Sequence, residues 1–179
     1  FALEARLGIP YAELSRLYEI DRIRRQYALF AAALGSAIDD SEYYNEANDA
    51  CARLQGECGG RTFAIGQVVN GNSIEMALAL EKLGLRVKAV FANISGDDFP
   101  FINELAELNP ELKVYSTLSP TMMNYDGSEK VDISIGIDAQ FYYPESINVH
   151  WNNEIQPFGY KGLVYFVEAI ERRLADERA

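Results

Sequence analysis

The chain contains 179 residues, 49% of them hydrophobic, and carries a formal net charge of −11 at pH 7. This length and apolar content suit a single domain with a sizeable core. Such an acidic surface disfavours nucleic-acid phosphates and anionic lipids, and no apolar run approaches the roughly 18 residues of a membrane span. We therefore expect no nucleic-acid partner and no membrane partner.

The cysteine content and the first residue add two expectations. Cys51 and Cys58 are too few for a disulfide framework, and their spacing matches neither a CxxC redox pair nor a zinc site. We expect one small core residue on a helix and one loop thiol, in a cytoplasmic, reducing setting. The sequence opens on Phe1 within a helix-like stretch, so we expect a piece of a longer protein.

The first part of the chain, residues 1–58, reads as a helical segment that packs on the rest. Its pattern predicts a short helical piece, a turn with a short extended segment, and two amphipathic helices. These elements fall at residues 2–7, 8–14, 19–34 and 41–56. Two consecutive glycines then separate this segment from residues 59–179, which we predict to form a Rossmann-like α/β domain.

The second part is organised around one strand–helix–strand unit. Residues 62–69 are apolar and partly β-branched, as in a strand that is buried on both faces. A polar turn at 70–73 ends on residues that cap helices well, and an apolar helical stripe runs from there to Gly84. A second strand follows at 85–93. Because ligands lie beyond the carboxyl ends of such strands, the turn is a candidate ligand-binding loop.

The alternation of strands and helices continues to the end of the chain. The pattern predicts strands at 112–118, 131–137 and 147–151, helices at 98–108 and from 163 onward, a loop or single turn at 119–127, a helical turn at 138–143 and a polar loop at 152–162. Five strands that alternate with helices indicate an α/β fold with a largely parallel sheet.

The candidate loop Asn70-Gly71-Asn72 allows two interpretations. With Gly66 it comes one residue short of a P-loop, and Asn72 stands where the phosphate-binding lysine belongs. No GxGxxG motif occurs either. The start of the following helix could attract an anionic group, or the loop could be a plain strand-to-helix turn.

Asp138 and His150 are candidate site residues because each follows a predicted strand. Asp138 could hold a polar ligand group or cap the helical turn that follows it. His150 is the only histidine, so no Ser/His/Asp triad can be built on another histidine, and a multi-histidine metal site is excluded. A hydrogen-bonded structural residue, a metal or cluster ligand, and a proton donor remain open for it.

Three segments together resemble the nitrogenase component 1 family, which includes the molybdenum–iron protein subunits, cofactor-maturing scaffold proteins and the dark-operative protochlorophyllide and chlorophyllide reductases. They are 8–11 (GIPY), 61–87 with RTFAIG and LEKLGLRV, and 150–166 with HW and PFGYKGLVYF. The resemblance covers nearly all 179 residues and corresponds to the later part of a family subunit.

The resemblance assigns roles to individual residues. His150 stands seven residues before Pro157-Phe158, and is similar to the histidine that ligates molybdenum in the family. The loop Asn70-Gly71-Asn72 would lie against the cofactor, although it lacks the expected basic residue. Asp138 stands where a lysine anchors the cofactor's organic acid. The family's cysteine ligand would precede the first residue of this sequence.

These departures argue against dinitrogen reduction. The resemblance implies a domain of a nitrogenase-like component 1 oxidoreductase with an iron–sulfur or iron–molybdenum-type cluster. Such a protein would receive electrons from an ATP-dependent iron–sulfur reductase, reduce a bound substrate or cluster, and assemble with a homologous component 1 subunit. The alternatives are a non-catalytic scaffold for a metal-cluster precursor or a tetrapyrrole-like ligand, and an interaction domain whose acidic surface docks partner subunits.

Overall fold

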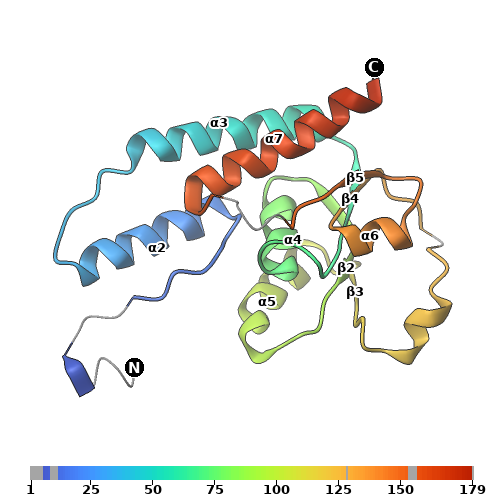
Figure 1. Ribbon diagram of the computed structural model, residues 1–179, viewed down its shortest axis with the longest axis horizontal. Helices are drawn as coiled ribbons and strands as arrows, with labels where there is room; N and C mark the ends of the chain where they lie inside the picture. Colours follow the sequence, from blue (N-terminus) through green and yellow to red (C-terminus); the bar gives the residue numbers. More distant parts are fainter. Residues whose placement is uncertain (1–5, 9–11, 128, 153–156, 179) are drawn as a thin grey trace.

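A five-stranded parallel sheet forms the centre of the protein, with strand order β3-β2-β1-β4-β5 (Figure 1). The computed structural model describes residues 6–8, 12–127, 129–152 and 157–178. The strands are β1 (Thr62–Ile65), β2 (Arg86–Phe91), β3 (Lys113–Tyr115), β4 (Ile133–Ile135) and β5 (Ile147–Val149). The predicted Rossmann-like α/β fold, preceded by a helical segment, is confirmed.

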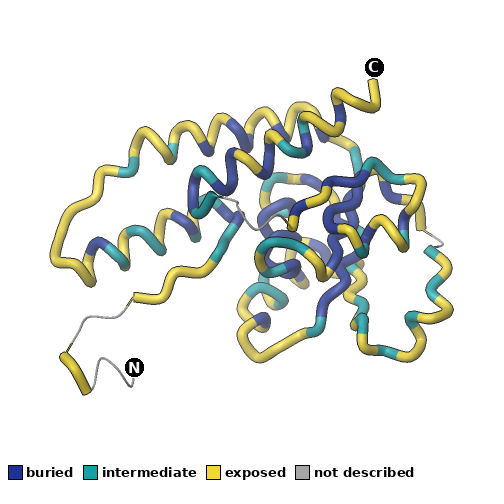
Figure 2. The backbone as a smooth tube through the Cα atoms, in the orientation of Figure 1, coloured by how far each residue is buried: buried dark blue, intermediate teal, exposed yellow. Residues whose placement is uncertain are grey.

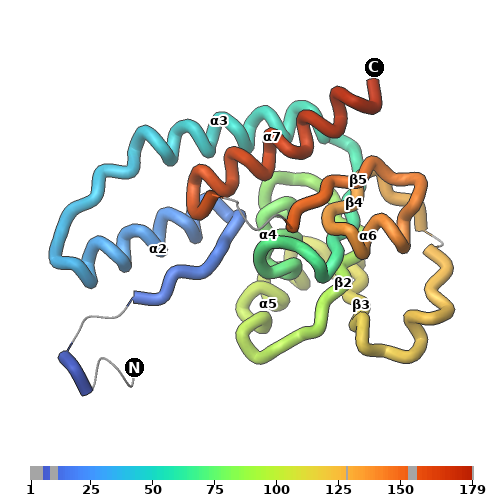
Figure 3. The backbone as a smooth tube through the Cα atoms, viewed as in Figure 1, coloured from blue at the N-terminus to red at the C-terminus, as the bar shows by residue number. Residues whose placement is uncertain are grey.

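Helices cover the two faces of the sheet unequally. The helical elements are α2 (Ile20–Ala33), α3 (Ser41–Cys58), α4 (Ser73–Lys82), η1 (Gly96–Asp98), α5 (Phe99–Leu108), η2 (Pro120–Asn124), α6 (Ile137–Tyr142) and α7 (Gly159–Arg178). Helices α4 and α5 lie on one side of the sheet, and the shorter α6 and η2 lie on the other (Figure 1). In Figure 3 the blue-green α3 runs beside the red α7, so the early helices pack against the end of the chain.

Alternation along β1 divides the core into two clusters. The buried segments of the chain are dark blue in Figure 2. Phe63 and Ile65 point into the larger cluster with α3, α4 and α7, and Ala64 points into the smaller one. That smaller cluster is mainly aromatic. In it, Phe91 stacks on Tyr142 with 4.3 Å between the ring centroids. The alternation along β1 between the two clusters is that of a strand whose successive side chains face opposite sides.

Several element boundaries differ from the sequence-based prediction. The sheet part of β1 ends at Ile65, four residues early, because the chain leaves the sheet at Gly66. Helix α3 passes through Gly56 to Cys58: a glycine inside a helix costs only about 1 kcal/mol, and full burial of Leu54 and Cys58 outweighs it. The predicted pieces at 2–7 and 8–14 lie partly outside the described residues, at 2–5 and 9–11. The division at residue 58 stays a prediction.

The start of α7 also differs from the prediction. It begins at Gly159 rather than at Leu163, since Tyr160 is buried against the helical segment. Within the described ranges, no helix combines the length and apolarity needed to cross a membrane.

A buried carboxylate joins the helical segment to the sheet layer. Glu75 on α4 is 0% exposed and accepts hydrogen bonds from the backbone N–H groups of Tyr18 (2.9 Å) and Glu19 (2.9 Å). Burial raises the pKa of Glu75 to about 7. Glu19 in turn caps α2 through its side chain. The position of α2 therefore depends on one ionisable side chain in the core.

Candidate functional site

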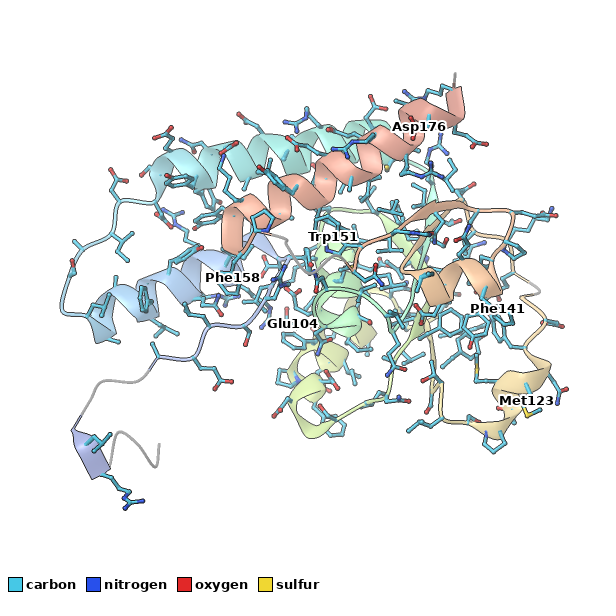
Figure 4. The ribbon with its side chains drawn as sticks, in the orientation of Figure 1. Glu104, Met123, Phe141, Trp151, Phe158 and Asp176 are labelled. Carbon is cyan, nitrogen blue, oxygen red and sulfur yellow. The ribbon has the colours of Figure 1, made fainter. Side chains whose placement is uncertain are left out.

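His150 lies one residue beyond β5, at the carboxyl end of an edge strand. Its side chain is exposed, and Nε2 is 3.1 Å from Oε1 of Gln140 on α6. The neighbouring Trp151 turns inward instead, is 4% exposed, and lies below α7 in Figure 4. The imidazole therefore faces a surface opening, not the core.

That opening is a cavity of about 810 Å³ between β5, α6 and the outer face of α7. Its lining consists of Gln140, Asn148, Val149, His150, Trp151, Tyr165, Glu168, Ala169, Arg172 and Arg173. Asn148 is held in place by Ser134, whose hydroxyl accepts from its amide at 2.8 Å. The cavity thus has a rigid floor and a polar rim.

The rim carries two arginines on a chain that is acidic as a whole. Arg172 and Arg173 stand against Glu168 as the charged side chains of the cavity lining. Arg173 donates from Nε to the backbone oxygen of Asn148 at 2.9 Å, and from Nη1 to Asp176 at 3.3 Å. The edge of β5 is therefore partly covered by a guanidinium group. This arrangement suits a polar or anionic ligand beside the imidazole.

The loop Asn70-Gly71 is fastened next to this cavity by the inward-facing Trp151. The N–H of Asn70 donates to the backbone oxygen of Trp151 at 2.7 Å, and the hydroxyl of Tyr18 donates to the backbone oxygen of Asn70. Gly71 has a φ of 137°, and a Cβ there would lie 2.8 Å from the Tyr18 ring. Burial raises the pKa of Tyr18 to about 12, so its hydroxyl stays a donor.

Asn72 is the N-cap of α4, as the sequence predicts. Its Oδ1 accepts from the N–H groups of Ile74 (2.8 Å) and Glu75 (3.1 Å), and its Nδ2 donates to Asp98. Both polar atoms of the side chain are used to hold helix starts.

Asp138 takes a position that neither sequence-based interpretation anticipates. Its carboxylate accepts from the N–H groups of Gln67 (2.6 Å) and Val68 (3.1 Å), in the loop after β1. The N-cap of α6 is Gly136, with no side-chain hydrogen bond, so the expectation that Asp138 caps this turn is wrong. Gly66 leaves room for this carboxylate beside the loop, because a Cβ there would be 2.0 Å from Asp138 Oδ1.

The location of this carboxylate matters for ligand binding. Strand order reverses between β1 and β4, and ligands of open α/β sheets enter the crevice at such a point. The Asp138 carboxylate places a negative charge in this crevice. It accepts hydrogen bonds from two backbone N–H groups that a bound anion would otherwise use. A phosphate at this loop is therefore disfavoured, in agreement with the missing P-loop lysine.

The structure brings the predicted residues to one edge of the sheet without joining them in one cavity. Asp138 and Gln140 share α6, and Asn70 contacts the residue after His150, but only His150 of the predicted set lines the 810 Å³ cavity. The sequence analysis missed Gln140, Tyr165 and Arg173 as lining residues. Tyr165, Glu168 and Arg172 are spaced along one face of a helix, and this spacing indicates that they line one surface.

Other metal-ligand candidates are not grouped. Across the described ranges no three His, Cys, Asp or Glu side chains come together in a way that could hold a metal ion. Cys51 and Cys58 are both buried on α3, so the expectation of a loop thiol is wrong. Burial raises the pKa of both thiols to about 11, which keeps them protonated and poor ligands.

Comparison with known proteins identifies the fold. A scan against protein-family models finds no match, and no curated protein matches the sequence. Among solved structures the chain is similar to nitrogenase Cp1 at pH 6.5, with a TM-score of 0.75 and 20% identity over 98% of this chain. The chain has a nitrogenase-like fold. It spans 42% of the length of that nitrogenase chain.

Proposed function

We propose that this chain is a domain of a nitrogenase component 1-like oxidoreductase, and that it supplies one face of a cofactor site. The observation that carries the proposal is His150, an exposed imidazole at the carboxyl end of β5 beside a cavity of about 810 Å³. The nitrogenase-like fold supports this proposal.

The described residues fit one ligand position of a metal cluster and not a complete cluster site. Outside His150 the cavity lining offers only Glu168 as a further His, Cys, Asp or Glu side chain. We therefore infer that an iron–sulfur or iron–molybdenum-type cluster would be held largely by other polypeptide. When bound, such a cluster stores and transfers electrons.

The chain's own residues would bind and orient. His150 would ligate, and Gln140, 3.1 Å from Nε2, would fix the plane and tautomer of the imidazole. Arg172 and Arg173 would attract an anionic part of the ligand. Asn70, Gly71, Asn72 and Asp138 would act as positioning residues, since they brace the loops on either side of β4.

The partners in this proposal are supported by the nitrogenase-like fold. We infer a homologous component 1 subunit, and an ATP-dependent iron–sulfur reductase as the electron donor. The electrons would reduce a substrate or cluster bound in the completed site.

A non-catalytic scaffold is the second candidate. It is favoured by the fact that no three-ligand metal group occurs within the described ranges. In that case the His150 cavity would hold a cluster precursor or a tetrapyrrole-like ligand without transferring electrons to it.

The test uses the protein purified without oxygen, in the polypeptide or complex that carries this chain. Iron and molybdenum are quantified, and ATP-dependent oxidation of the iron–sulfur reductase is followed by its visible absorption. We expect bound iron and electron uptake, with both reduced in His150→Ala and unchanged in Leu29→Ala, an exposed position on α2. Bound ligand without electron uptake would support the scaffold. A folded protein that binds neither would refute both.

A further inference from the structure

A second cavity, of about 280 Å³, lies at the far end of the helical layer. Its lining, which shares no residue with the His150 cavity, is Tyr27, Phe30, Ile38, Asp39, Asp40, Tyr43, Phe158, Tyr160 and Lys161. We propose that this cavity binds a small organic cation, an alkylammonium or quaternary ammonium group. The proposal does not depend on the function proposed for His150.

Aromatic rings from three helical elements form the walls. Tyr27 and Tyr160 lie 5.2 Å apart between ring centroids at 38°, and Tyr160 is only 3% exposed. Phe158 lies where the chain enters α7 and approaches α2 (Figure 4). The face of each ring carries negative charge density that attracts a cation within about 6 Å. Five aromatic side chains line this cavity, and aromatic rings of this kind are what proteins use to bind ammonium groups.

The rings are held by the backbone of the α7 start. A Cβ at Gly159 would lie 1.9 Å from the hydroxyl oxygen of Tyr27, so the tyrosine ring occupies the space that a side chain would need. Gly159 also has a φ of 62°, which glycine adopts without strain. The Tyr27 ring is therefore held close against the start of α7 before any ligand is bound.

Two carboxylates make the cavity favour a positively charged ligand. Asp39 is exposed, and hydrogen bonds from Ser41 hold its pKa below the usual range, so it is ionised at neutral pH. Asp40 Oδ2 accepts a hydrogen bond from the hydroxyl of Tyr160 at 2.6 Å. The Asp40 carboxylate therefore lies at the hydroxyl edge of the Tyr160 ring.

Lys161 is the single cationic side chain in this lining, and its charge is already compensated. Its Nζ lies 2.6 and 2.7 Å from the two carboxylate oxygens of Glu46. The same Nζ is 5.9 Å from the centroid of the Tyr43 ring. The ammonium group of Lys161 therefore lies near the Tyr43 ring, and Glu46 compensates its charge. Asp39 and Asp40 remain available to another cation.

The size and polarity of the cavity narrow the ligand class. Its volume is below the roughly 300–1,000 Å³ of sites for drug-sized ligands, so the ligand is small. The walls are mostly rings, whereas a metal ion needs a shell of oxygen donors. An ammonium group that carries alkyl substituents satisfies both the rings and the aspartates.

The test titrates the protein with choline chloride and, in parallel, with 3,3-dimethyl-1-butanol, the uncharged analogue of the same shape. Binding is measured from ligand methyl and tyrosine ring resonances by NMR. We expect saturable choline binding that Tyr43→Ala weakens about 2- to 5-fold, the effect of one ring. Tyr43 is 50% exposed, so the fold tolerates its removal. Asp39→Asn should weaken binding as well.

Tyr165→Ala is the matched control, because Tyr165 is an equally exposed tyrosine (51%) that lines the other cavity. It should leave choline binding unchanged. Equal affinity for the uncharged analogue, equal effects of Tyr43→Ala and Tyr165→Ala, or no saturation by choline would each overturn the proposal.

Discussion

The buried carboxylate of Glu75 makes the stability of this fold depend on pH in an unusual direction. Burial raises its pKa from 4.5 to about 7, against the hydrogen bonds that it accepts from the N–H groups of Tyr18 and Glu19. The folded protein therefore holds this proton up to a higher pH than the unfolded chain. The stabilisation is fully present below about pH 4.5 and is lost as the pH rises through about 7.

Glu75→Gln removes the charge and keeps an oxygen that can accept from the same N–H groups. Each pKa unit corresponds to about 1.4 kcal/mol, so between pH 5 and pH 8 the ionised carboxylate costs roughly 2–3 kcal/mol. We expect the free energy of unfolding of Glu75→Gln, relative to the wild type, to rise by that amount over this range. Urea denaturation at pH 5, 6, 7 and 8 measures it.

Comparison with the wild type cancels the other ionisable groups, which both proteins share. Glu107→Gln, an exposed glutamate on α5, is the matched control for the loss of one negative charge. Its difference from the wild type should vary little with pH. A constant difference between Glu75→Gln and wild type from pH 5 to pH 8 would show that Glu75 does not titrate in this range.

Three further substitutions or reactions test the packing around the site. Asp138→Ala should destabilise the protein by about 1–3 kcal/mol, because it removes the acceptor of two loop N–H groups; chemical denaturation measures this. Gly66→Ala should lower the free energy of unfolding by about 1–3 kcal/mol, because its methyl group clashes with Asp138. The double variant Gly66→Ala/Asp138→Ala should lose less than the sum of the two single losses, and an additive loss would contradict the contact. Cys51 and Cys58 should resist a thiol-specific reagent at pH 8 until urea unfolds the chain, whereas fast reaction of the native protein would show that they are accessible.

Local signals in the sequence are sufficient for much of the fold. Asn72 and the apolar stripe after it predict α4 because capping and helical periodicity act within a few residues. Strand ends are harder to predict, since a parallel strand and the loop beyond it can both be apolar. The run from Thr62 to Val69 continues past Ile65, and only the backbone contacts of the folded sheet show where β1 ends.

The candidate site, like the fold, has parts that the sequence predicts and parts that it does not. A lone histidine at the end of a predicted strand can be recognised from sequence, and His150 does face a cavity. Its partner Gln140 and the wall formed by Arg173 depend on how α6 and α7 pack, which no local pattern specifies. Glu75 is the extreme case: its hydrogen-bond donors are 56 and 57 residues away, so its burial is invisible in the helix itself.

The most direct test of the central claim is whether the imidazole of His150 binds the cofactor. The anaerobically purified protein, grown with ¹⁵N-labelled histidine, is measured by pulsed electron paramagnetic resonance beside His150→Gln. We expect a ¹⁵N hyperfine coupling to a paramagnetic cluster in the wild type, and its loss in the variant. A cluster signal without that coupling, or a coupling that survives in His150→Gln, would contradict the assignment of His150 as a ligand.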